Sequence, residues 1–162
     1  MAPESRTELT IGGVSKEGLR ARLVVASVSL NAYAESLFAA PEFTVSGREH
    51  RIDLVTVSLE QLGLPSGGSL PTIFEQATSR GYAPCPLEVA PHLRLLFLDQ
   101  SSGPYLTVAS PRPRPDDMDF PAGFYLRWLE DGLWLRGYRT DDDWIWPPGF
   151  SRFVFSLPTR SD

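Results

Sequence analysis

The residues best suited to recognising a ligand lie in one stretch, residues 124–138, where arginines are interspersed with aromatic side chains. An Asp131-Gly132 pair divides this stretch and is typical of a two-residue β-hairpin turn of type I′. Since such a turn fixes the strand register, we predict that Arg127 lies directly opposite Arg136. The same hairpin face then carries four further side chains, Tyr125, Leu129, Trp134 and Tyr138. The other face carries an apolar set that we predict to be core, Phe124, Leu126, Trp128, Leu133 and Leu135.

Two arginines that face each other across a hairpin repel by a few tenths to about 1 kcal/mol, so a compensating interaction is expected. One interpretation is internal: Asp99 or the run at 141–143 supplies a carboxylate, or aromatic rings stack on the guanidinium groups. The other is a binding site for a carboxylate, a phosphate or an acidic protein segment. The residues that we predict for this site are Arg127, Arg136, Trp134, Tyr125 and Tyr138.

A second set of candidates suggests a small hydrolase or a metal-dependent enzyme instead. Cys85 and His92 have the residue types of a nucleophile and its base, although no glycine loop for an oxyanion adjoins them. Alternatively, Cys85 is a small buried thiol in a turn bracketed by prolines. Two acidic loops, with aspartates at 116–119 and at 141–143, offer the hard oxygens that Mg²⁺ or Ca²⁺ prefers, but such loops are usually solvated faces.

Other site signatures are incomplete. The glycines of residues 63–69 precede a predicted helix, but the lysine of a phosphate-binding loop is missing. His50 and His92 have no histidine or cysteine at zinc-ligand spacing, and a single cysteine excludes a disulfide within the chain. We therefore predict no cofactor and no metal, and the sequence favours a binding or regulatory module over an enzyme.

The composition predicts one folded domain that binds neither membranes nor nucleic acid. The chain has 162 residues, of which 42% are hydrophobic, enough for one globular core. Its net charge of −5 disfavours a phosphate backbone, so that nucleic-acid binding through Arg112 and Arg114 is only a third hypothesis. We see no signal peptide, and the longest apolar run, residues 23–30, is too short to span a bilayer. We expect a cytoplasmic protein.

Capping residues and apolar periodicity predict the elements that position these candidates. Ser15, Asn31 and Ser69 are predicted N-caps of three helices, and Gly81 is expected to end the third. Strands are predicted at 9–11, 52–57, 93–98, 105–109 and 153–155 besides the hairpin, with a turn at 101–103. We expect flexible ends at 1–8 and 158–162. Residues 9–157 then form a single α+β domain, with N-terminal helices packed on one face of a mostly antiparallel sheet of about five strands.

Several segments of this sequence together resemble a known family. They are Leu9-Thr-Ile-Gly-Gly13, Leu30-Asn-Ala-Tyr-Ala34, Ile52-Asp-Leu-Val55, Leu62-Gly-Leu-Pro-Ser-Gly67, Cys85-Pro-Leu-Glu-Val-Ala-Pro91, Leu93-Arg-Leu95, Asp99-Gln100, Asp131-Gly-Leu-Trp-Leu135 and Phe153-Val-Phe155. The chain thus resembles, over residues 9 to 157, a family of small uncharacterised bacterial proteins with no established activity. The resemblance implies a compact bacterial single-domain protein and no catalytic residue. An uncovered face around Trp134 would also suit a homodimer.

Overall fold

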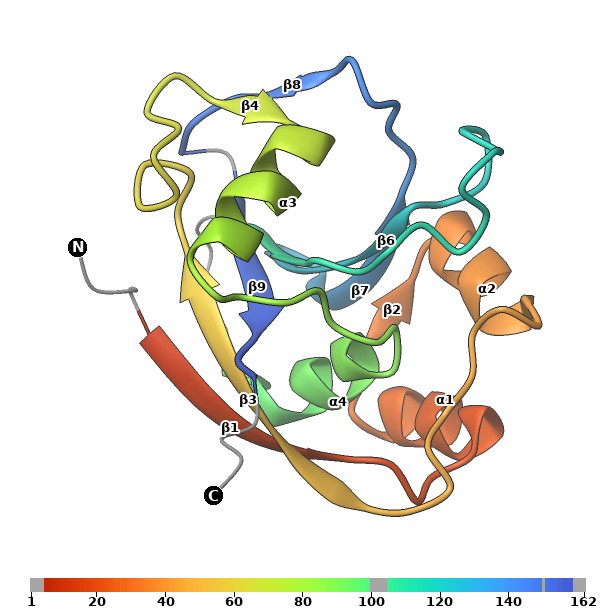
Figure 1. The fold of residues 1–162 in the computed structure, drawn as a ribbon. Helices are drawn as coiled ribbons and strands as arrows, with labels where there is room; N and C mark the ends of the chain where they lie inside the picture. Colours follow the sequence, from red (N-terminus) through yellow and green to blue (C-terminus); the bar gives the residue numbers. More distant parts are fainter. Residues whose placement is uncertain (1–4, 100–104, 150, 159–162) are drawn as a thin grey trace.

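One mixed sheet of seven strands organises the computed structural model, which describes residues 5–99, 105–149 and 151–158 (Figure 1). The helices are α1 (Lys16–Val25), α2 (Ala32–Ala39), α3 (Leu70–Ser79) and α4 (Val89–Leu96). The seven strands of the main sheet are β1 (Ser5–Ile11), β2 (Ser29–Leu30), β3 (His50–Val57), β5 (Tyr105–Val108), β6 (Gly123–Leu129), β7 (Gly132–Tyr138) and β9 (Ser151–Ser156). A second, small sheet pairs β4 (Gly68–Ser69) with β8 (Ile145–Trp146).

The strand order of the main sheet is β1-β3-β9-β5-β6-β7-β2. Two neighbouring pairs, β5 with β9 and β2 with β7, run parallel, whereas the other four pairs are antiparallel. The α+β class is therefore confirmed, but the prediction of about five mostly antiparallel strands is too simple. The sequence could not show that β9, the last strand, inserts between β3 and β5, because strand order depends on long-range packing.

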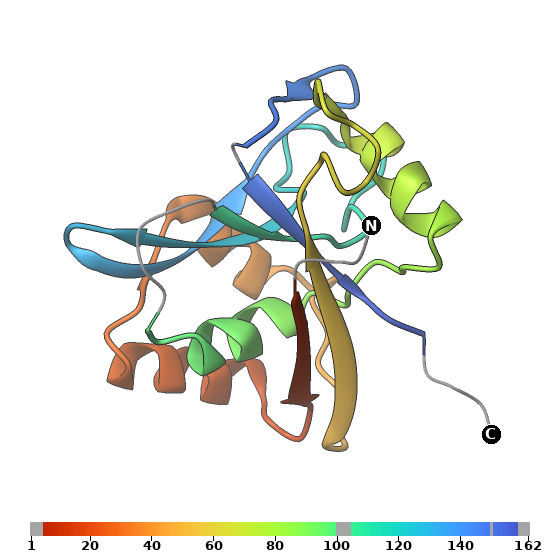
Figure 2. The same ribbon diagram turned by 90° about the vertical axis from the view of Figure 1, so that its left-hand side faces the viewer.

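Helices cover both faces of this sheet, not one face as predicted, and they are spread along the chain. Alternate side chains of a strand point to opposite faces, and here both sets include apolar residues, so an apolar cluster lies on each side of the sheet. On one side, α1, α2 and α4 pack on a cluster that includes Leu54, Phe124 and Val154. On the other side, α3 packs on a second cluster around Phe153 and Phe155 (Figure 2).

The predicted helix caps are confirmed. The side chains of Ser15 and Ser69 accept hydrogen bonds from main-chain N–H groups in the first turns of α1 and α3. Gly81, at a φ of 82°, follows Arg80, the C-cap residue of α3, at a position where a left-handed conformation favours glycine. Among the described helices, none combines the length and apolarity that crossing a bilayer requires.

Asn31 caps α2 and also bonds to the sheet. Its Oδ1 accepts from the main-chain N of Ala34, at 2.9 Å, and from that of Gly137, at 2.8 Å. Its Nδ2 donates to the main-chain O of Gly137 at 3.0 Å. The asparagine amide thus pairs with β7 as a strand residue would. A side chain at 137 could not fit, since its Cβ would lie 2.7 Å from the carbonyl carbon of Tyr33.

Two predictions of secondary structure are wrong, one in where a strand begins and one in the type of element. The strand expected at 9–11 begins at Ser5, so residues 5–8, which we expected to be flexible, pair with β3. The strand expected at 93–98 is instead helix α4 for most of its length. Pro91 lies in the first turn of α4, where its missing N–H is not needed. The turn predicted at 101–103 and most of the predicted flexible C-terminus lie outside the described residues.

The helical position of Arg94 buries its side chain completely. The guanidinium group donates to the main-chain O of Phe97, at the end of α4, and to those of Arg127, at 3.4 Å, and Trp134, at 3.2 Å. Burial lowers the pKa of Arg94 to about 10, which leaves it charged at neutral pH. This one side chain therefore joins α4 to both strands of the β6–β7 hairpin.

We predict that Arg94→Met lowers the free energy of unfolding by about 3 kcal/mol, because three main-chain carbonyls lose a charged donor. Urea denaturation measures the change. The matched control is Arg80→Met at the exposed end of α3, for which we expect a change within about 0.5 kcal/mol. Equal effects of the two substitutions would contradict a structural role for Arg94.

Candidate functional site

The register of the β6–β7 hairpin differs from the prediction by two residues. Arg127 pairs with Trp134, and Arg136 pairs with Tyr125, so the two arginines are diagonal neighbours and not opposite each other. The two residues between the paired Leu129 and Gly132 are Glu130 and Asp131, and neither has the positive φ that a type I′ turn needs. Gly132, at a φ of 123°, is instead the first residue of β7. A shift of two residues leaves every side chain on its predicted face.

The outer side of this hairpin forms what we call the arginine face, made of Tyr125, Arg127, Trp134, Arg136 and Tyr138. It lies on the same side of the sheet as α3, but none of the fully buried residues of the second apolar cluster comes from β6 or β7. Its five side chains are all half-buried, in contrast to the apolar residues Phe124, Leu126 and Leu135 on the other side. The predicted division of the hairpin into a core face and a polar-aromatic face is therefore confirmed for these residues.

Trp128 is an exception, since it was predicted to be core and is 38% exposed. It points to the core side of the sheet by register, opposite Leu133 near the turn, but the hairpin end extends beyond the tightly packed interior. Of the other tryptophans, Trp146 is buried and Trp144 is 44% exposed. The alternation of residues along a strand predicts which side of the sheet a side chain occupies, but not how far other residues bury it.

Each arginine of the arginine face stacks on an aromatic ring. The Cζ atom of Arg127 lies 4.3 Å from the ring centroid of Tyr105 on β5, and that of Arg136 lies 5.1 Å from the ring of Trp134. Such contacts stabilise a cation by about 0.5–1 kcal/mol. No carboxylate among the described residues forms an ion pair with Arg127 or Arg136, and the buried Nε of Arg136 has no hydrogen-bond partner there. The internal compensation is therefore stacking and not a salt bridge.

A cavity of about 390 Å³ opens beside the arginine face. Its lining, which we call the tyrosine cavity, comprises Tyr105, Thr107, Tyr125, Tyr138, Arg139, Thr140, Asp141, Trp144 and Trp146. The ring of Tyr125 lies 5.3 Å from that of Tyr105 and 6.3 Å from that of Tyr138, so three tyrosines form a continuous aromatic surface. Two of the predicted site residues, Tyr125 and Tyr138, thus belong to both the cavity and the arginine face.

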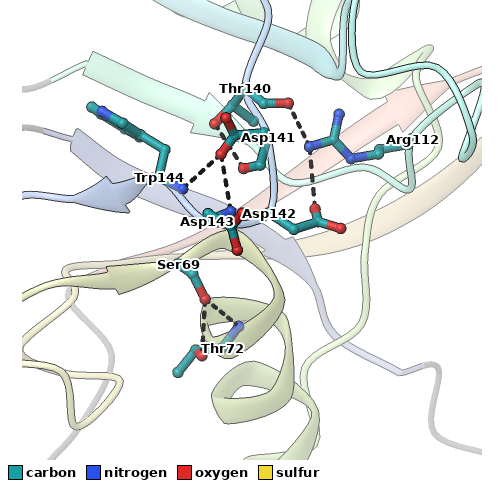
Figure 3. Close-up of polar contacts among 8 residues, drawn as sticks. All are labelled: Ser69, Thr72, Arg112, Thr140, Asp141, Asp142, Asp143 and Trp144. Carbon is teal, nitrogen blue, oxygen red and sulfur yellow. Dashed lines mark hydrogen bonds and ion pairs between the residues drawn. The ribbon is translucent and has the colours of Figure 1, made fainter.

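The loop at 139–146 forms one wall of the cavity and is held by Arg112 (Figure 3). The Nη2 of Arg112 donates to the main-chain O of Thr140, at 2.6 Å, and to Oδ1 of Asp142, at 3.3 Å. Asp141 Oδ1 accepts from the main-chain N atoms of Asp143 and Trp144. Two carboxylates of the acidic run, those of Asp141 and Asp142, therefore bond within this region and not to the arginine face.

The hydroxyl of Tyr138 and Nη1 of Arg112 are buried without a hydrogen-bond partner among the described residues. The Tyr138 side chain lines the cavity, but its hydroxyl oxygen is shielded from solvent. Burial raises the pKa of Tyr138 well above its usual range, and nearby Arg112 opposes this rise. The phenol hydroxyl therefore remains a donor at any physiological pH.

No hydrogen bond joins Cys85 to His92, the alternative enzymatic residues, in the described part of the chain. Cys85 is buried, its Sγ lies 3.7 Å from the main-chain O of Val154, and burial raises its pKa to about 12. His92 Nε2 accepts from the main-chain N of Gly12 at 3.4 Å. Burial lowers the pKa of His92, Glu88 opposes this and Arg22 adds to it. A protonated thiol and a histidine that is already bonded do not form a nucleophile and base.

The other acidic and basic candidates are also engaged within the fold. No group of three or more metal-ligating side chains lies close enough to hold an ion within the described part of the chain. Asp117 Oδ1 accepts from the main-chain N of Asp119. Arg114, one of the two arginines of the nucleic-acid hypothesis, bonds to Glu42 and lies 3.9 Å from the ring centroid of Phe120.

The geometry of the arginine face and the tyrosine cavity is the basis for assigning a function. Comparisons of the chain with protein-family models, with curated proteins and with solved structures find no match. The sequence had indicated the arginine face, but not Tyr105, Thr107 or the loop at 139–146. The signal for these was absent because they join the site only through the pairing of β5 with β6 and through the return of the loop.

We predict that Cys85 does not react with iodoacetamide in the folded protein at about pH 8, because its thiol is buried and its pKa is raised to about 12. Intact mass spectrometry should show no adduct in native buffer and one adduct in guanidinium chloride. Rapid native labelling would contradict the buried position.

We predict that acidification below about pH 6.5 destabilises the protein through His92. Because burial lowers its pKa in the folded chain, the unfolded chain binds the proton more tightly. The stability is therefore complete above the unfolded pKa and falls with pH down to the folded pKa, by up to about 1.4 kcal/mol per pH unit. Urea unfolding at several pH values should show this slope in the wild type and in His50→Asn, an exposed control, but a smaller slope in His92→Asn. Equal slopes in all three proteins would exclude His92 as the cause.

Proposed function

We propose that the protein is a non-enzymatic binding module that holds an anionic ligand, a small anion or an acidic protein segment, on the arginine face. The observation that carries this proposal is the diagonal pair Arg127 and Arg136, which no described carboxylate neutralises. Diagonal neighbours on one sheet face lie about 7–8 Å apart at Cα, so one carboxylate or phosphate can bridge their guanidinium groups.

Stacking prepares both arginines for this role. The guanidinium group is planar and binds carboxylate or phosphate oxygens in pairs, and a ring stacked on it restricts the orientation of that plane. The rings of Tyr105 and Trp134 thus restrict the side chains of Arg127 and Arg136 before the ligand arrives. Trp134 is itself fixed, since its Nε1 donates to Asp131 Oδ1 at 3.0 Å. Less conformational entropy is then lost on binding.

The adjoining cavity supports binding more than catalysis. Its lining contains no histidine or cysteine, and its one carboxylate, Asp141, accepts two hydrogen bonds from its own loop. The hydroxyl of Tyr138 stays protonated because burial raises its pKa. Among the cavity residues there is thus no general base of the kind that an enzyme with a Cys-His pair or a paired carboxylate uses.

We predict that inorganic phosphate shifts the side-chain Nε–Hε NMR signals of Arg127 and Arg136 with one common dissociation constant. Arg127→Gln or Arg136→Gln should weaken this binding about tenfold, the loss expected for one charge-assisted hydrogen-bond partner. Arg51→Gln is the matched control, because Arg51 lies on the same sheet but already pairs with Glu8 and Asp53.

The two possible results are distinct. Saturable shifts at both arginines that Arg51→Gln leaves unchanged support the proposal. The proposal is wrong if phosphate moves the Arg51 signal as much as the other two, or if neither Arg→Gln substitution on the arginine face weakens binding.

A further inference from the structure

We infer that the ligand is an aromatic acid whose planar ring enters the tyrosine cavity while its carboxylate or phosphate lies on Arg127 and Arg136. This inference rests on the proposed function, since it adds a second subsite to the same anion site. It is carried by the continuity of the two surfaces. Tyr105 lines the cavity and also stacks on Arg127, and Tyr125 lines the cavity and pairs with Arg136 across the hairpin.

The lining of the cavity fits a flat apolar body. Five of its nine residues are aromatic, Tyr105, Tyr125, Tyr138, Trp144 and Trp146. Their rings form a chain of contacts, with centroids 5.5 Å apart between Tyr138 and Trp146 and 5.0 Å apart between Trp144 and Trp146. Aromatic rings prefer offset or edge-to-face contacts at such separations, and a ligand ring can continue this arrangement. A volume of about 390 Å³ lies at the lower end for small-molecule sites and suits one or two fused rings.

The charges set the orientation of the ligand. Asp141 lines the cavity, so a second anionic group placed there would be repelled. Arg139 also lines it, but this side chain lies 3.9 Å from Asp119 and stacks over Tyr33. Arg127 and Arg136 have no carboxylate partner among the described residues, and each contacts a cavity residue: Arg127 stacks on Tyr105, and Arg136 pairs with Tyr125. The neutral ring therefore belongs inside and the acidic group outside.

The cavity thus combines an aromatic surface with an adjoining pair of cations, and together they fit an aromatic acid.

The test uses 2-naphthoate, with 2-naphthamide as the neutral ring and acetate as the acid without a ring. Isothermal titration calorimetry on the full chain should give 2-naphthoate a dissociation constant at least about tenfold below those of both controls. Trp144→Ala should weaken 2-naphthoate about tenfold and leave the phosphate response of Arg127 and Arg136 unchanged. Trp128→Ala is the matched control, because this tryptophan is similarly exposed but lies on the other side of the sheet, and it should change neither.

The outcomes separate the two proposals. If phosphate binds at the arginines but 2-naphthoate binds no better than acetate, or Trp144→Ala has no effect on it, the aromatic subsite is wrong and the anion site stands. If neither phosphate nor 2-naphthoate depends on Arg127 and Arg136, the proposed function itself fails. If 2-naphthamide binds as tightly as 2-naphthoate, the cavity takes a neutral ring and the aromatic-acid class is overturned.

Discussion

The hydrogen bonds of buried Arg94 are the interaction on which the rest of the structure depends. A charge removed from water needs several partners, and here three main-chain carbonyls provide them. Two of these belong to Arg127 and Trp134, whose side chains project to the other side of the sheet. Helix α4, on the opposite side of the sheet from the arginine face, thus holds the main chain of Arg127 and Trp134. Arg94 in this way connects α4 to the main chain that carries two residues of the arginine face.

The parts of the fold that could be predicted from the sequence are those that local chemistry determines. A serine or asparagine that caps a helix acts within three residues, so Ser15, Asn31 and Ser69 were sufficient signals. The segment 93–98 was not predictable in this way. Its leucines suit a buried strand as well as a buried helix. Two carbonyls of a distant hairpin, together with that of Phe97, are the partners of the completely buried arginine.

The candidate site was predictable in composition but not in geometry. Strand alternation assigned Tyr125, Arg127 and Arg136 to one face, and this assignment survives a register error of two residues. The pairing itself depends on backbone dihedrals of the turn, which the Asp131-Gly132 motif does not determine. The cavity depends on contacts between more distant segments, because β5 reaches it by pairing with β6 and the loop at 139–146 forms its other wall. The sequence therefore indicates which residue types form the site, but not the shape of the cavity that they line.

The amide of Asn31 has a further consequence, for how far the sheet can grow. On that side the outermost strand, β2, has two residues, and the Asn31 side chain occupies the next main-chain groups of β7, at Gly137. An edge this short and already bonded offers no template for another strand. The opposite edge, β1, is seven residues long and pairs only with β3. Any extension of the sheet by an added strand, from a partner or in an aggregate, is therefore directed to β1, on the far side of the sheet order from the arginine face.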